Sequence, residues 1–235
     1  MNAAYQWVVD AIPEFKYDVG SPIPPVFESY ARLFHPAYRG GQTPTDHGST
    51  TVSWHAVAET NGRVAHPAME WGSIVGSWSA RSQTGLWDRP PDHGRLPAEA
   101  TEELSRLLQQ CSGVKSVMYA LWRGYAGIEI DSAELFELPL RPMAVINGSI
   151  DDATEPFGIP GRTANLWWAT DHQWCVATDI DLLTTYVGGS AQCMEAIAAS
   201  SALEAVVVTS SQRITWDADT LNPLPDPPGG VRNPV

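Results

Sequence analysis

The sequence predicts an α+β fold, in which a largely antiparallel sheet in the C-terminal half packs against helices. The clearest helix is expected over residues 98–110, where Pro97 marks the start, leucines form an apolar stripe and Gly113 marks the end. Beyond it the pattern changes to short apolar or aromatic segments separated by turn residues, which is typical of strands. Because these strands follow one another instead of alternating with helices, antiparallel pairing is favoured.

Shorter helices and loops are expected in the first part of the chain. Apolar residues recur at helical spacing in three segments, which predicts helices over residues 2–12, 26–34 and 54–60. Pro13 is placed to end the first of these helices, and Ser53 is placed to cap the third. The Ser-, Arg-, Gly- and Pro-rich segment 76–97 is expected to be a long loop.

The second part of the chain is predicted to be rich in strands. The expected strands cover residues 116–122, 134–138, 143–146, 165–168, 174–177, 184–187 and 205–209, with a further helix over 191–199. Three regions follow from these patterns: a helical and loop-rich region 1–96, an α+β region 97–221 and a mobile Pro/Gly-rich tail 222–235. Such regions are compatible with one compact domain.

The net charge restricts the classes of partner. The 235 residues include 14 Lys and Arg against 27 Asp and Glu, which gives −13. Residues 1–118 contribute −3 and residues 119–235 contribute −10. Nucleic-acid binding depends on clustered Lys and Arg that neutralise phosphates, so no nucleic-acid partner is expected. An acidic surface suits a basic protein partner, although solubility alone would account for the same charge.

Cysteine usage and hydropathy indicate the compartment. Cys111, Cys175 and Cys193 are widely spaced, without a Cys-x-x-Cys pair, which argues against a disulfide framework or a zinc site. No apolar run approaches the roughly 18 residues of a membrane span. The first residues lack the basic start and long apolar run of a secretory signal. We therefore expect a cytoplasmic protein without membrane association, and no metal or other cofactor is predicted.

Tryptophan provides the most distinctive candidate site. The candidate ligand-binding residues are Trp167, Trp168, Trp174, Asp171, Asp179 and Asp181. Indole rings beside carboxylates suit the recognition of cations and of sugar faces. Because Trp167 and Trp168 point to opposite faces of a strand, the alternative is that they fill two packed layers while the acids are merely solvated.

Two smaller patterns could carry chemistry. Asp179 and Asp181 are expected on one face of a strand, about 7 Å apart. Such a pair could bind a hard cation or divide general acid and base roles, or it could be a solvated strand face. His172 and Cys175 could form a nucleophile pair, although the sequence around Cys175 is typical of a small buried residue. No catalytic residue is assigned from these patterns.

Several segments of the chain also carry a family resemblance. They are residues 24–32, 61–67, 166–168, 174–181 and 185–190. Together they resemble a family of uncharacterised actinobacterial proteins, and the Trp-Cys-Val-Ala-Thr segment at residues 174–178 is the most distinctive part. That family has no established function, so the resemblance implies no catalytic residues.

Two kinds of function remain open from the sequence. The first is a soluble, acidic, non-catalytic interaction protein that recognises a basic partner in an immunity- or antitoxin-like role. The alternative is an enzyme that binds a small molecule or carbohydrate with the Trp/Asp site. That alternative requires the six side chains to converge on one concave pocket, with carboxylates about 5 Å or about 6.5–9.5 Å apart for glycoside hydrolysis. Mimicry of DNA is disfavoured, since only 17% of the residues are charged.

Overall fold

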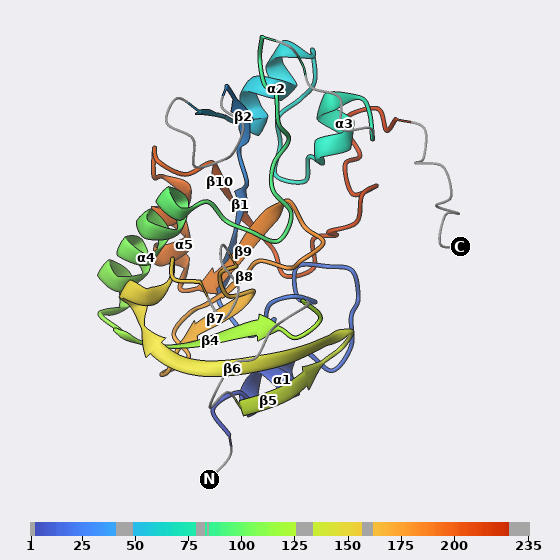
Figure 1. The fold of residues 1–235 in the computed structure, drawn as a ribbon. Coiled ribbons are helices and arrows are strands. Elements are labelled where there is room, and N and C mark those ends of the chain that lie inside the picture. Colours follow the sequence, from blue (N-terminus) through green and yellow to red (C-terminus); the bar gives the residue numbers. More distant parts are fainter. Residues whose placement is uncertain are drawn as a thin grey trace. The chain divides into compact units, whose positions relative to one another are not determined.

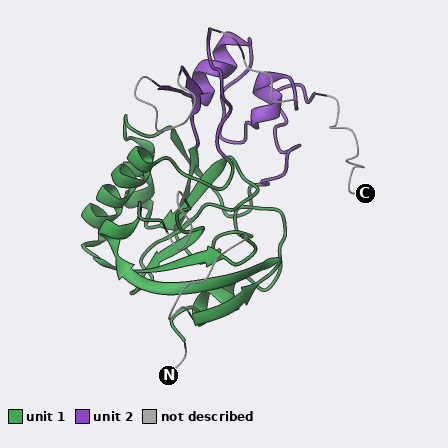
Figure 2. Cartoon of the chain, viewed as in Figure 1, with its two compact units in different colours: residues 1–34, 93–212 green, residues 35–92, 213–235 purple. Residues whose placement is uncertain are grey.

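The computed structural model describes residues 3–40, 49–78, 83, 85–125, 134–156 and 162–225. The chain forms two compact units (Figure 2). Unit 1 comprises residues 1–34 and 93–212, and unit 2 comprises residues 35–92 and 213–235. Among the helices in the described ranges, none is long and apolar enough to cross a membrane.

Unit 1 is built on one eight-stranded sheet (Figure 1). Its strands are β1 (Ser29–Phe34), β4 (Ser116–Trp122), β5 (Glu134–Leu138), β6 (Arg141–Ser149), β7 (Leu166–Ala169), β8 (Cys175–Ala177), β9 (Thr184–Gly189) and β10 (Ala205–Val208). Their order is β10-β1-β9-β8-β7-β4-β6-β5, and each neighbouring pair is antiparallel. The predicted α+β class with a largely antiparallel sheet is therefore confirmed.

Two helices, α4 (Ala98–Ser112) and α5 (Ala191–Ala198), cover one face of this sheet (Figure 1). Gly113 ends α4 in the left-handed conformation, at φ +71°, and donates its N–H to the carbonyl of Gln109. The buried stripe of α4 joins one core with α5 and with the side chains that this sheet face presents, among them Leu104, Leu108, Tyr119, Trp167, Val176, Val187, Met194 and Ile197. Burial of this apolar surface holds the helices on the sheet.

The segment that precedes β1 lies against the opposite face. It includes α1 (Gln6–Ala11), in which Val8 is fully buried. The ring of Trp7 meets the ring of Trp168 edge to face at 6.2 Å. Phe27 packs directly on Gly188, where a larger residue would collide with its ring. Unit 1 therefore has three layers, and the central strands β1, β7, β8 and β9 are buried on both faces.

The helix predicted over residues 26–34 is wrong, because residues 29–34 form the strand β1. β1 lies inside the sheet, paired with β9 on one side and β10 on the other. Five of its six residues are buried, so the alternation of apolar and polar residues that marks a half-exposed strand is absent. The spacing of its apolar residues therefore fits a helix as well as it fits a strand.

Within its described residues, unit 2 combines a two-stranded ribbon with two short helices. Its elements are β2 (Ala37–Arg39), β3 (Thr50–Val52), α2 (Trp54–Thr60) and α3 (Trp71–Val75). Ser53 caps α2 as predicted, because its side chain accepts the N–H of Ala56. The ring of Trp71 lies between those of Trp54 and Trp87, with both centroid separations at 5.3 Å. These aromatic contacts supply much of the core of this small unit.

The buried carboxylate of Asp219 connects the two chain segments of unit 2 through hydrogen bonds. Asp219 is 2% exposed and accepts a hydrogen bond from His66 Nε2 at 2.8 Å. It also accepts the backbone N–H and the side-chain amide of Asn222, whose amide donates in turn to the carbonyl of Val64. Burial alone would raise the pKa of Asp219, but these hydrogen bonds outweigh it and hold the pKa below its ordinary value.

The two units do not follow the regions expected from the sequence. The expected boundary between 1–96 and 97–221 separates β1 from the strands with which it pairs. The expected tail 222–235 begins at a buried residue, since Asn222 is 6% exposed and hydrogen-bonded within unit 2. The rest of that tail, residues 226–235, lies outside the described residues.

Candidate functional site

The three tryptophans of the predicted site are buried in the core of unit 1. Trp167 and Trp174 are 4% and 1% exposed and belong to the core beneath α4 and α5. Trp168 is fully buried on the opposite face of the sheet. The indole N–H of Trp174 donates to the hydroxyl of Ser112. These indoles therefore fill two packed layers, and none offers a free ring face to a ligand.

The three aspartates of the predicted site are divided between two turns. Asp171 is exposed in the turn between β7 and β8, where it accepts the backbone N–H and the side-chain amide of Gln173. Asp179 and Asp181 lie in the turn between β8 and β9. These turns are at opposite ends of β8, so the structure keeps Asp171 apart from the other two.

Asp179 and Asp181 both form ion pairs with Arg141 of the same chain. The expected strand face is replaced by a turn, in which Asp179 Oδ1 accepts the backbone N–H of Asp181. The guanidinium of Arg141 donates from Nε and Nη2 to the two oxygens of Asp179, at 3.0 Å each. Nη2 also donates to Asp181 Oδ2 at 2.7 Å. This bidentate hydrogen bonding to Asp179 is the geometry in which arginine commonly binds a carboxylate.

Burial differs sharply between the members of this ion pair. The side chains of Arg141 and Asp179 are 17% and 9% exposed, whereas that of Asp181 is 73% exposed. Burial alone would lower the pKa of Arg141, but the two carboxylates outweigh it and raise the pKa above its ordinary value. Arg141 therefore stays charged, and its main partner is Asp179.

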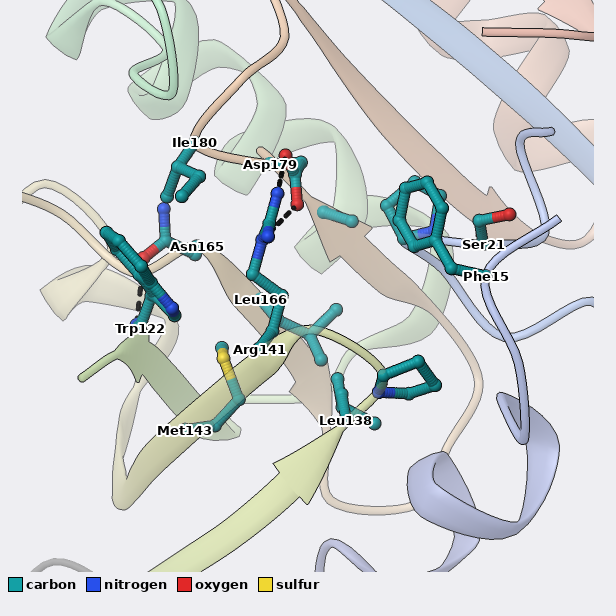
Figure 3. A pocket seen from close by; sticks show the side chains of 13 residues that line it. Phe15, Ser21, Trp122, Leu138, Arg141, Met143, Asn165, Leu166, Asp179 and Ile180 are labelled. Carbon is teal, nitrogen blue, oxygen red and sulfur yellow. Dashed lines mark hydrogen bonds and ion pairs between the residues drawn. The ribbon is translucent and has the colours of Figure 1, made fainter. Parts of the chain in front are cut away.

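A hollow adjoins this ion pair, with Trp122, Asn165, Phe15 and Met143 among the side chains around it (Figure 3). Its volume is about 30 Å³, which leaves room for about one or two water molecules. Asn165 is committed to the fold, because its side chain accepts the N–H of Trp122 and donates to the carbonyl of Thr178. The space beside the Asp-x-Asp pair is thus filled by Arg141 and its neighbours.

A larger hollow, of about 300 Å³, lies between α4 and the short 3-10 helix η1 (Ile150–Asp152). The residues around it are Glu102, Ser105, Arg106 and Gln109 from α4 and Ile150, Asp151, Ala153 and Thr154 from η1 and the turn after it. Glu102 and Asp151 are exposed. Neither carboxylate has an ion pair with any other residue in the described part of the chain.

The one guanidinium at this hollow is already engaged. Arg106 Nε and Nη2 donate to the two carboxylate oxygens of Glu103, at 2.7 and 2.8 Å. Ser200 adds a third hydrogen bond to the same carboxylate. The bonds from Arg106 and Ser200 lower the pKa of Glu103 to about 2. Arg106 is therefore neutralised by Glu103, and the charge left at the hollow is that of Glu102 and Asp151.

Sequence reasoning did not single out this hollow. Its signals were present as three acids in the first half of α4 and an Asp-Asp pair at a turn. The two segments are separated by β4, β5 and β6, and only the sheet brings them together.

The histidine and cysteine candidates are held in structural contacts. His172 stacks on Trp7 with ring centroids 4.4 Å apart, whereas Cys175 is fully buried in the sheet. Burial raises the pKa of the Cys175 thiol, which makes the thiolate unfavourable. Within the described ranges, no group of three or more His, Cys, Asp and Glu side chains is arranged to hold a metal ion.

Comparison of the chain with protein-family models, with curated proteins and with solved structures finds no match. The geometry of the chain itself is therefore the basis for proposing a function.

Proposed function

We propose that this chain is a non-catalytic interaction protein that binds a basic protein partner through unit 1. The observation that carries the proposal is the division of charge between the units. Unit 1 contains 8 Lys and Arg against 19 Asp and Glu, a net charge of −11. Unit 2 contains 6 and 8 of these residues, a net charge of −2. The acidic field therefore belongs to one compact unit.

Much of this negative charge is available to a partner. Glu99, Glu102, Asp151, Glu155 and Glu195 are all exposed, and none has an ion pair with another described residue. Fixed charge of one sign attracts partners of the opposite sign, speeds association and disfavours partners of like charge. An immunity- or antitoxin-like role in the cytoplasm is one form of this function.

The alternative, an enzyme with a Trp/Asp site, lacks support from the geometry. It requires six side chains on one concave pocket, whereas the tryptophans are buried in two layers and the aspartates lie at opposite ends of β8. We therefore propose the interaction role alone.

Co-purification from the native host at low and at high salt tests the proposal. We expect a basic protein to be retained at low salt and released as the salt concentration rises, because salt screens exposed charges. The same experiment with Glu99→Gln and Glu195→Gln in one chain should retain less of that protein. Failure to retain any basic protein, or retention that salt leaves unchanged, would overturn the proposal.

A further inference from the structure

Resting on the proposed function, we propose that the hollow between α4 and η1 is the docking site for one arginine or lysine side chain of the basic partner. The hollow is bounded by two elements of unit 1 that meet across the end of the sheet. One wall is the face of α4 that carries Glu102, Ser105 and Gln109. The other wall is formed by η1 and Thr154.

The size of the hollow fits a side chain. Sites for small molecules usually have volumes of roughly 300–1,000 Å³. At about 300 Å³, this hollow lies at the lower end of that range. It is ten times the volume of the space beside Arg141, which has room for only about one or two water molecules.

The charge at the hollow fits a cation. Glu102 is on the α4 wall and Asp151 is on the η1 wall, so an inserted cation is flanked by two carboxylates. Asp152 is not among the residues around the hollow; its carboxylate accepts the N–H of Ser149 and so holds η1 in place. Arg106 does not repel the guest, because Glu103 binds its guanidinium through two hydrogen bonds.

The rest of the lining suits the stem of a long basic side chain. Ile150 and Ala153 are 2% and 6% exposed and belong to the core, so they provide an apolar floor. Lysine and arginine pack their methylene stems on apolar surface while the charged end stays near polar groups.

The rigidity of both walls favours binding, because little order has to be created when the guest enters. α4 is anchored by Leu104 and Leu108 in the core. η1 is fixed by a capping box, in which Ser149 and Asp152 satisfy each other's backbone N–H groups.

NMR chemical-shift mapping of the backbone amides, with a short peptide as the ligand, tests this site directly. The probe is acetyl-Gly-Gly-Arg-Gly-Gly-amide, with a lysine version and a citrulline version, the last of which has the shape of arginine without its charge. We expect the arginine and lysine peptides to shift the backbone amides of residues 102–109 and 150–154. The citrulline peptide should shift them little at the same concentration.

Matched variants separate the hollow from the general acidic field. Glu102→Gln with Asp151→Asn should raise the Kd for the arginine peptide at least about tenfold. The control is Glu134→Gln with Glu137→Gln, which removes the same charge from exposed carboxylates outside the hollow and should change the Kd less than about threefold. Thr154→Trp, which fills the hollow without changing the charge, should weaken binding as strongly as the first pair. Thermal unfolding and near-UV circular dichroism verify that each variant is folded.

Three outcomes would overturn the docking site: shifts scattered over unit 1, equal losses in the two double variants, or no binding of the peptide. The co-purification experiment distinguishes these outcomes from failure of the proposed function. A basic partner that is retained and released by salt, but is insensitive to Glu102→Gln with Asp151→Asn, leaves the interaction role standing and places the contact elsewhere on unit 1.

Discussion

Replacement of Arg141 by methionine should destabilise unit 1 strongly, because it leaves Asp179 as a poorly solvated charge without a counter-ion. The side chain of Asp179 is 9% exposed, and its two carboxylate oxygens accept hydrogen bonds from Arg141 at 3.0 Å. Removing one partner of a fully buried ion pair costs about 3–5 kcal/mol. Since Arg141 itself is 17% exposed, we reduce the expected loss for Arg141→Met to about 2–3 kcal/mol.

Two further variants show whether the loss comes from the buried pair. Asp181→Asn should cost about 0–1 kcal/mol, because the side chain of Asp181 is 73% exposed and solvent screens its contact with Arg141. Arg141→Met combined with Asp179→Asn should be less destabilised than the sum of the single variants, since the second change removes the uncompensated charge.

Urea unfolding at neutral pH, followed by far-UV circular dichroism, measures these free energies. The change should appear as a lower midpoint with an unchanged slope, which marks a loss of stability without a change in the surface exposed. A loss below about 1 kcal/mol for Arg141→Met, or a loss equal to that of Asp181→Asn, would refute the assignment of the stabilisation to a desolvated pair.

Three other predictions concern the core, a glycine turn and the pH dependence. Trp168→Ala should cost about 3–5 kcal/mol in urea unfolding, because a fully buried indole is removed from a two-sided sheet; a loss near 1 kcal/mol would contradict this packing. Gly94→Ala should destabilise more than Gly113→Ala, since both glycines have positive φ but only at Gly94 would the new Cβ collide with the backbone of Ile180; equal losses would contradict the clash. The pKa of Asp219 is lowered on folding, so the stability that this carboxylate supplies is complete above its ordinary value of 3.8 and declines as the pH falls further. Asp219→Asn should therefore be less stable than the unchanged chain at neutral pH, and it should lose less stability below pH 4. Acid titrations followed by tryptophan fluorescence measure this difference. Parallel stability curves for the two chains would exclude the carboxylate as the cause.

Elements with local signals could be predicted from the sequence. The strands β4 and β5 have the predicted bounds, 116–122 and 134–138, and α4 was located from Pro97 and Gly113. In each case the deciding information lies within the element or next to it, as a turn residue, a cap or an apolar stripe. Such signals need no knowledge of distant partners.

β1 required non-local information. Its apolar residues suit a helix as well as a strand, and the choice depends on backbone partners in β9 and β10, far away in the sequence. Once those strands are present, β1 satisfies the backbone groups along the facing edges of β9 and β10, which a helix, hydrogen-bonded within itself, would leave unpaired.

The candidate sites also depend on contacts between segments that are distant in the sequence. The sequence indicated the Asp-x-Asp pair but not its counter-ion, because Arg141 and Asp179 are 38 residues apart along the chain. It indicated the tryptophans but left open whether they bind a ligand or pack in two layers, since burial depends on what covers each sheet face. The hollow between α4 and η1 likewise exists only because β4 and β6 pair and bring its two walls together.

The sequence by itself determined the antiparallel α+β class and a net charge of −13, because strand and helix signals are local and composition is independent of conformation. Only the tertiary structure decided where that charge lies. The chain leaves unit 1 after residue 34, returns at residue 93 and leaves it again after residue 212, so two distant segments with little net charge form unit 2. The acids thereby gather in unit 1, where the pairing of distant strands brings Arg141 to Asp179, while exposed acids such as Glu102 and Asp151 have no ion pair with another described residue.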